Sequence, residues 1–313
     1  MAAVTCARAF LPVLLAAFAG GCATPPPLTL AEAEPKVAAG EALVVAGRFD
    51  DALDTLEPLA QDACPKRLRD RVDVARATSL HGQGELWQAF LVLEQFPERN
   101  PHSDLRPLVV EKLWQIGQAL VRSDSGFLFF WSDERAGRSV LEHLVTRHPD
   151  SPRLADALRI LGDLAFADEN HELAQARFRQ LMLERPESEW VGYAQFRFAM
   201  SIVASIEGPA YDLDRMEQGQ RELRDFLANP PENPEIVRAA TAAAAQLLAW
   251  RLDRHLRIAA YYRRIDNVAG QLHHLEVAAG PEFAAAPRYA EAVTARNELR
   301  ASAGASPGGA SPP

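Results

Sequence analysis

The chain has 313 residues, of which 48% are hydrophobic and 24% are charged, a balance typical of a large folded domain or a repeat array. Its 33 lysines and arginines stand against 42 aspartates and glutamates, for a formal net charge of -9. This acidic balance argues against nucleic acid as a partner, because binding to phosphates depends on clustered positive charge. It argues equally against electrostatic docking on anionic lipid.

The N-terminal segment predicts export. Arg8 precedes an uncharged apolar stretch over residues 9–21, which is too short to span a bilayer because a spanning helix needs roughly 20 residues. A short basic region followed by a short apolar run and small residues predicts a secretory signal peptide over residues 1–21. The segment ends in Ala19-Gly20-Gly21-Cys22, which resembles the lipobox of bacterial lipoproteins. The resemblance implies that Cys22 is acylated, by fatty acids such as palmitate, and becomes the mature N-terminus. The alternative is an ordinary signal peptide with an incidental cysteine.

The residues that follow predict a spacer. Residues 22–35 are rich in proline, and a semi-rigid tether of this kind could hold a folded body roughly 40 Å from a bilayer. Removal of the signal peptide would also remove Cys6, and acylation would occupy Cys22. Cys64 is then left without a partner in the chain, which excludes a disulfide framework.

From Ala33 onward the chain predicts helices and no sheet. Apolar residues recur three and four positions apart, as at Leu158, Leu161 and Leu164, which is the spacing of an amphipathic helix. Prolines fall between the helical segments and mark a repeat. The punctuating prolines are Pro65, Pro101, Pro149, Pro186 and Pro231.

Each repeated segment carries small and large residues at matching positions, a pattern that resembles the tetratricopeptide repeat. A small residue lets two helices of a hairpin approach closely, and larger apolar residues fill the seam between them. The matching sets are Gly47, Phe49, Ala52, Leu56 and Leu59 in the first segment, Gly84, Leu86, Ala89, Leu93 and Phe96 in the second, and Ala174, Phe178 and Leu181 in the fourth, with Gly137 and Gly219 at the small position of the third and fifth.

The repeat pattern predicts an all-α solenoid of about six helical hairpins wound as a right-handed superhelix. One long helix is expected near residues 235–264. The fourth segment has Glu169 and His171 where the tetratricopeptide pattern prefers a glycine and an aromatic residue. This departure leaves open how tight the turn between its two helices is.

The stretch from about Trp131 to Leu299 resembles the outer-membrane assembly lipoprotein family BamD, also called YfiO. The resemblance divides the body into divergent N-terminal repeats over residues 36–104 and a BamD-like region over residues 105–301, followed by a Gly/Ser/Pro-rich tail over residues 302–313 that we expect to be disordered. The motifs that carry it are LEHLVTRHPDSP at 141–152, LADAL at 154–158, RPES at 185–188 with Trp190, EGPAYD at 207–212 and DRHLRIAAYYRR at 253–264. The chain departs from the family after Arg264, where Ile265-Asp266-Asn267 replaces a Gly-Ala-Tyr turn.

The resemblance implies a non-catalytic scaffold anchored by lipid to the outer membrane and facing the periplasm. Its implied partners are proteins of the β-barrel assembly machinery and unfolded outer-membrane proteins. One alternative is a tetratricopeptide-repeat envelope lipoprotein that organises a cell-wall or export complex, and a less favoured one is an enzyme subunit. The histidines lack metal-ligand spacing, and no nucleophile elbow is present. We therefore expect no catalytic residue, no metal site and no cofactor.

Two clusters are candidates for partner binding. Tyrosine and arginine are enriched in interface cores, which marks the run Tyr261, Tyr262, Arg263 and Arg264; the alternative is a packed helix face with a charged edge. The second cluster is aromatic and lies in an insertion within the third hairpin, where it could form an exposed docking patch or fold back onto the solenoid. Its residues are Phe127, Phe129, Phe130 and Trp131.

Overall fold

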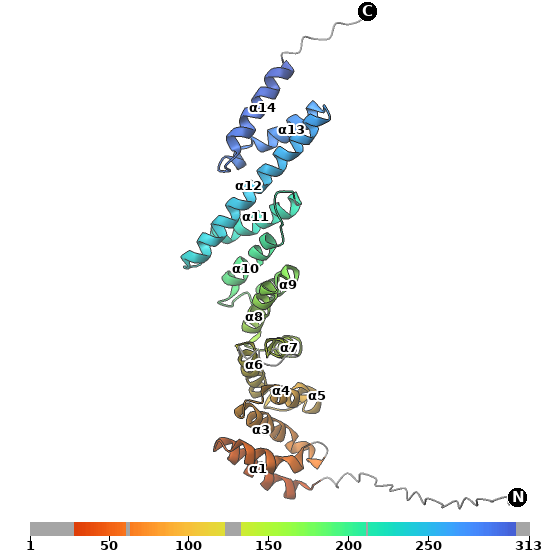
Figure 1. Ribbon diagram of the computed structural model, residues 1–313. Helices are drawn as coiled ribbons and strands as arrows, with labels where there is room; N and C mark the ends of the chain where they lie inside the picture. Colours follow the sequence, from red (N-terminus) through yellow and green to blue (C-terminus); the bar gives the residue numbers. More distant parts are fainter. Residues whose placement is uncertain (1–27, 61–62, 123–132, 211, 305–313) are drawn as a thin grey trace, which may run out of the picture.

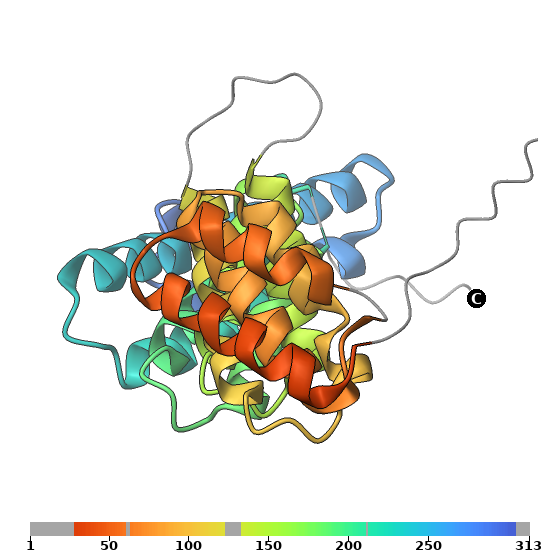
Figure 2. The same ribbon diagram turned by 90° about the horizontal axis from the view of Figure 1, so that it is seen from below.

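The computed structural model describes residues 28–60, 63–122, 133–210 and 212–304. Across these ranges the chain is helical and contains no strand, and consecutive helices pack against one another. Figure 1 shows the helices following one another along an elongated column, with α1 at one end and α14 at the other. Viewed from below, the successive helices lie one behind another (Figure 2). The predicted all-α fold class is confirmed.

The helices form consecutive packed pairs. The pairs are α1 (Leu30–Val45) with α2 (Phe49–Leu56), α3 (Arg69–Gly82) with α4 (Leu86–Glu94), α6 (Arg106–Arg122) with α7 (Asp133–Arg147), α8 (Leu154–Ala167) with α9 (His171–Glu184), α10 (Val191–Ala204) with α11 (Leu213–Ala228), and α12 (Pro234–Arg264) with α13 (Val268–Ala278). Between or after these pairs lie α5 (Phe96–Arg99), α14 (Tyr289–Gly304) and the short 3-10 helices Glu57–Leu59, Lys66–Leu68 and Pro281–Phe283.

Glycine on the first helix of a pair allows close contact with the second. A Cβ added to Gly40 would lie 2.6 Å from Leu56, and one added to Gly162 would lie 2.7 Å from Phe178. A side chain at either position would therefore push the two helices apart. The alanines predicted at the small positions of the second helices are fully buried, as expected. They are Ala52, Ala89 and Ala174.

The turns within four of the helix pairs, α1–α2, α3–α4, α8–α9 and α12–α13, share one conformation. Gly47 and Gly84 have φ angles of 72° and 83°, and Glu169 and Asp266 adopt the same left-handed conformation with φ angles of 61° and 51°. At Glu169 the backbone N–H donates to Phe166 O at 3.1 Å, and the next N–H, that of Asn170, donates to Ala165 O at 2.9 Å. The equivalent two bonds close the turn at Gly47. The turn left open by the sequence is thus as tight as its glycine-containing counterparts.

Glu169→Gly is expected to stabilise the protein by about 1 kcal/mol, because a residue with a Cβ is strained in the left-handed region and glycine is not. The measurement is the midpoint of urea unfolding. Glu169→Ala is the matched control, since it removes the same carboxylate but keeps the strained Cβ. Equal midpoints for the two variants would show that the turn stores no such strain.

The folded body begins earlier than the sequence suggests. Helix α1 starts at Leu30, inside the segment predicted as tether, and contains Pro35. The carboxylate of Glu32 accepts hydrogen bonds from the backbone N–H of Thr29 at 2.9 Å and from its hydroxyl at 2.6 Å, which stabilises the helix start. This start signal and the helix-forming residues around it outweigh the hydrogen bond that the proline removes. At the other end, α14 continues to Gly304, into the predicted tail.

The long helix predicted near residues 235–264 is present as α12, Pro234–Arg264. Its first half packs on α10 and α11, where Leu247 belongs to one apolar cluster. Its second half packs on α13, where Leu252 belongs to a separate cluster with Phe283 and Ala292. Helix α12 therefore connects the column of pairs to the C-terminal helices, and both halves contribute to a core.

Arginine side chains connect one helix pair to the next. Arg177 on α9 donates to Glu142 on α7 at 2.7 and 2.5 Å, and Arg197 on α10 donates to Asp163 on α8 at 3.0 Å. These partly buried pairs add directional contacts between neighbouring pairs of helices. Further connections of this kind include Arg71 to Glu34 and Glu41, Arg138 to Asp168, Arg153 to Glu111, Arg251 to Glu217, and Arg288 to Asp253.

Candidate partner-binding surfaces

The run Tyr261–Arg264 lies in the last turn of α12, where the helix distributes its side chains over three faces. Tyr262 packs inward: its ring stacks on His274 of α13 with centroids 5.7 Å apart and planes at 17°. A Cβ added to Gly270 would lie 2.6 Å from the ring of Tyr262. Tyr262 therefore holds α13 against α12, which fits the packed-face alternative better than a docking role.

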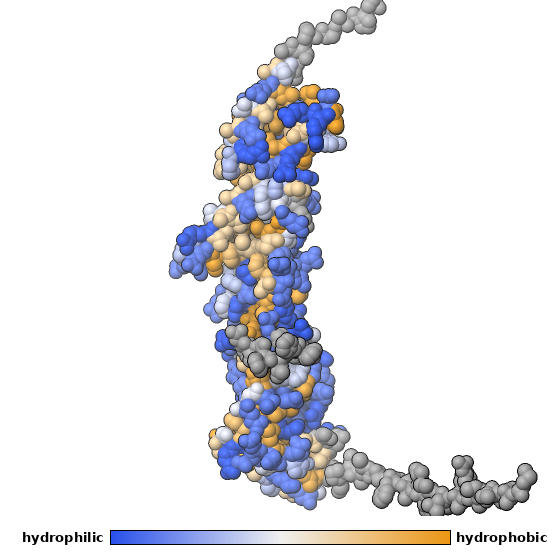
Figure 3. All heavy atoms as spheres, in the orientation of Figure 1, coloured by the Kyte–Doolittle hydropathy of each residue, from blue (hydrophilic) through white to orange (hydrophobic). Residues whose placement is uncertain are grey.

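Tyr261 and Arg264 form an exposed pair on another face. The Tyr261 side chain is 50% exposed, and the guanidinium of Arg264 lies 5.9 Å from the centre of its ring. Two apolar residues follow at the turn into α13, since Ile265 is 52% exposed and Val268 is 48% exposed. Figure 3 shows hydrophobic residues gathered in the region of α13 near the upper end of the column. We call Tyr261, Arg264, Ile265 and Val268 the α12–α13 corner.

Arg263 lies on a third face, at a cavity between α12, α13 and α14. The cavity has a volume of about 240 Å³, and Arg257 and Gln271 also line it. Sequence analysis missed Arg257. The available signal was helical spacing, because Arg257, Ala260 and Arg263 follow one another at intervals of three residues and so share one face.

A neutral histidine contact lies between α12 and α13. The Nδ1 atoms of His255 and His274 are 3.1 Å apart and share a hydrogen bond. Burial, together with the charges of His274 and Arg251, lowers the pKa of His255 to about 4. Burial also lowers the pKa of His274. Both rings are consequently neutral near pH 7, and the contact belongs to the packing of the helices.

A second groove lies at the N-terminal end of the column, between α1, α3 and α6. It has a volume of about 450 Å³ and is mainly apolar, with Val74, Ala75 and Leu108 in its wall. Val45 at its edge is 90% exposed. Arg71 at the rim is held by Glu41 and Glu34. The groove lies where α1 and α3 meet α6, and it is a second candidate surface for partner binding.

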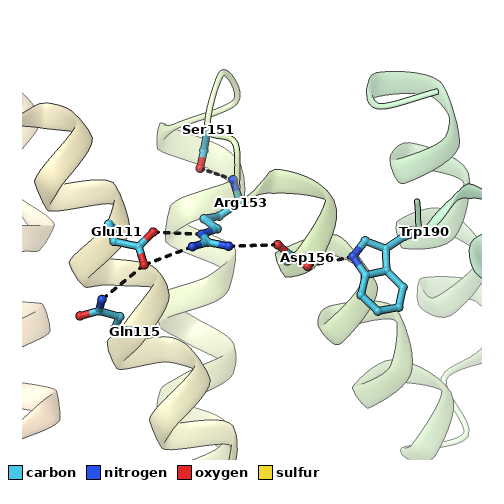
Figure 4. Close-up of polar contacts among 6 residues, drawn as sticks. All are labelled: Glu111, Gln115, Ser151, Arg153, Asp156 and Trp190. Atoms are coloured by element: carbon cyan, nitrogen blue, oxygen red, sulfur yellow. Dashed lines mark hydrogen bonds and ion pairs between the residues drawn. The ribbon is translucent and has the colours of Figure 1, made fainter. Parts of the chain in front are cut away.

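Side chains at and near the repeat joints identified in the sequence form a network of polar contacts across the first helices of three pairs (Figure 4). Arg153 donates to both carboxylate oxygens of Glu111 on α6, at 3.0 and 3.3 Å, and pairs with Asp156 at 3.8 Å. The indole N–H of Trp190 donates to Asp156 at 2.8 Å. The guanidinium of Arg159 lies 4.4 Å from the centre of the Trp190 ring. Because each charged group in this network has a partner, the network is better explained as a structural connection between helix pairs than as a docking site.

Several predicted residues lie outside the described part of the chain. They are the acylation site Cys22 and the aromatic insertion Phe127, Phe129, Phe130 and Trp131. Cys64 is described and buried, and burial raises the pKa of its thiol. A raised pKa disfavours the thiolate, which is the reactive form of a cysteine.

The described residues were compared with the requirements of a metal site and of a membrane-spanning helix. In the ranges that the structure describes, no three histidine, cysteine or acidic residues converge in a way that could hold a metal ion. Of the helices described there, none combines the length and the apolar character needed to cross a membrane. A scan against protein-family models found no match to this chain, and a search of the curated proteins found none either.

Proposed function

We propose that this chain is a BamD-like lipoprotein scaffold that binds partner proteins during the assembly of outer-membrane β-barrel proteins. In this proposal the helix pairs form a tetratricopeptide-like, right-handed solenoid, anchored through Cys22 to the outer membrane and facing the periplasm. The partners are proteins of the β-barrel assembly machinery and unfolded outer-membrane proteins. The role is structural, with no catalytic step.

The observation that carries the proposal is the α12–α13 corner. A partly exposed aromatic ring, an arginine and two exposed apolar side chains meet at one turn, Tyr261, Arg264, Ile265 and Val268. Such a combination is common in the cores of protein interfaces. The corner lies at the end of the motif DRHLRIAAYYRR, on which the resemblance to the BamD family depends most.

A second candidate function is a scaffold for a cell-wall or export complex. The apolar groove between α1, α3 and α6 favours it, because two of its three walls, α1 and α3, belong to the repeats that diverge from the BamD family. The two candidates differ in the partner and in the surface that is used. Either partner could be identified by the same experiment.

Tyr261→Ala combined with Arg264→Ala is expected to reduce co-purification of an outer-membrane β-barrel protein by roughly thirtyfold or more, because a single interface hot spot is worth about 2 kcal/mol. Both side chains are exposed, so helicity measured by circular dichroism should not change. Leu183→Ala is the matched control, because Leu183 is an exposed apolar residue on α9, far along the column.

Unaltered capture of the β-barrel protein by the double variant would place the contact elsewhere. Capture of cell-wall or export proteins, lost on mutation of Val45 and Leu108 in the N-terminal groove, would favour the second candidate instead.

A further inference from the structure

The cavity between α12, α13 and α14 combines an apolar floor with a basic rim. Its floor is formed by Leu256, Ala259, Leu275 and Ala295. Its rim carries the guanidinium groups of Arg257 and Arg263 and the amide of Gln271. The lining as a whole comes from all three helices, since Gln271 and Leu275 lie on α13 and Ala295 lies on α14. The alanines leave the space that larger side chains would fill.

The two rim arginines have no partner within the described residues. Neither the guanidinium of Arg257 nor that of Arg263 makes a hydrogen bond or ion pair there, and both side chains are exposed. The neighbouring Arg288 is different, since it donates to Glu291 at 2.8 and 2.6 Å and to Asp253 at 2.8 Å. The carboxylate of Glu291 is thereby already engaged. The cavity consequently presents two uncompensated positive charges.

The positive charge at this cavity contrasts with the negative net charge of the chain as a whole. The chain as a whole carries a formal net charge of -9, whereas residues 251–304 contain eight arginines against six aspartates and glutamates. An acidic protein with a locally basic cavity attracts an anionic group there and repels it elsewhere. Guanidinium groups pair with carboxylates through directional, charge-assisted hydrogen bonds.

The size and floor of the cavity restrict the ligand further. About 240 Å³ is below the roughly 300–1,000 Å³ of sites that enclose drug-sized molecules. A carboxylate with one neighbouring aliphatic side chain is small enough to enter, and the apolar floor gives that side chain a dry contact.

From this geometry we infer that the cavity docks a segment of a partner protein in which a glutamate or aspartate adjoins an aliphatic residue. The carboxylate lies between Arg257 and Arg263, and the aliphatic side chain contacts Leu256, Leu275 and Ala295. The inference rests on the proposed partner-binding function and names the chemistry of one contact. The site lies on a different face of α12 from the α12–α13 corner.

The test uses the purified folded chain and two capped peptides, acetyl-Ala-Leu-Glu-Leu-Ala-amide and its Glu→Gln counterpart, with binding measured by titration calorimetry. The glutamate peptide should bind, and the glutamine peptide should bind at least tenfold more weakly. Arg257→Glu with Arg263→Glu should weaken binding of the glutamate peptide by tenfold or more. Arg238→Glu is the matched control, because Arg238 is an exposed arginine at the far end of the same helix.

A third variant separates shape from charge. Ala295→Leu fills the floor of the cavity without altering any charge and should weaken binding of the glutamate peptide severalfold. Equal binding of the two peptides, or no effect of either cavity variant, would overturn the inference. Inorganic phosphate that binds as tightly as the glutamate peptide would also overturn it, because the apolar floor would then contribute nothing.

Failure of this inference can be distinguished from failure of the proposed function. If the peptides do not bind but the Tyr261→Ala, Arg264→Ala variant loses its partner, the proposed function is supported and the cavity is not a docking site. If the glutamate peptide binds as expected but no β-barrel partner is captured, the cavity is a docking site and the proposed class of partner is wrong.

Discussion

Lowering the pH from 7.5 to 5.0 is expected to destabilise the folded protein by several kcal/mol through His148 and His255. Both side chains are buried, 6% and 8% exposed, and burial lowers the pKa of each to about 4 from an ordinary value of 6.5. As the pH falls below 6.5, the unfolded state binds protons that the folded state excludes. Stability is therefore full above pH 6.5 and is lost progressively towards pH 4, by about 2 kcal/mol for each histidine at pH 5.

Neighbouring charges raise or lower the pKa of these two histidines. The charges of His143, Arg106 and Arg147 lower the pKa of His148, and Glu98 opposes them. Around His255, the charges of His274, Arg251 and His273 lower the pKa and Glu217 opposes them. In each case burial is the largest cause, so the direction of the pH effect follows from the packing of the helices.

The measurement is urea unfolding at the two pH values. The variant His148→Gln, His255→Gln should lose much less stability between pH 7.5 and 5.0 than the unmodified protein. His102→Gln, at an exposed position, is the control and should behave like the unmodified protein. An equal pH dependence in all three proteins would contradict the burial of neutral histidines at these positions.

Gly137→Ala is expected to have the second large effect, a loss of about 2–3 kcal/mol from overpacking. A Cβ at this position would lie 2.7 Å from the backbone nitrogen of Val121 and 2.9 Å from the backbone oxygen of Gly117. Because the backbone cannot rotate away as a side chain can, helices α6 and α7 would have to separate.

Gly192→Ala is the matched control for this prediction. It also lies in a helix, but an added Cβ would meet no atom within 4 Å. Alanine is the better helix former, so this change should be neutral or stabilising by up to about 1 kcal/mol. Similar thermal unfolding of the two variants would contradict the close contact between α6 and α7.

The regular part of the fold could be predicted from the sequence because its causes are local. The apolar spacing of three and four residues predicted the helices, and the small residues predicted where paired helices touch, as Ala52, Ala89 and Ala174 confirm. The start of α1 was missed because proline at position 35 suggested a break, whereas the capping interaction of Thr29 with Glu32 begins the helix earlier.

The candidate site was predictable only in part, because it depends on contacts between helices. Four consecutive residues in the sequence suggested one patch, but successive helical residues point about 100° apart. Tyr262 faces α13, Arg263 faces the cavity, and Tyr261 with Arg264 faces outward. Only the position of α13 and α14 shows which of these side chains are covered.

Site-specific photocrosslinking in intact cells tests the central claim most directly. A crosslinking amino acid at position 261, in the α12–α13 corner, is expected to capture an outer-membrane β-barrel protein. The same amino acid at position 183, exposed on α9, should not capture it. Capture of the barrel protein from position 261 alone would support the proposed scaffold. No crosslink from position 261, or crosslinks only to cell-wall or export proteins, would contradict it.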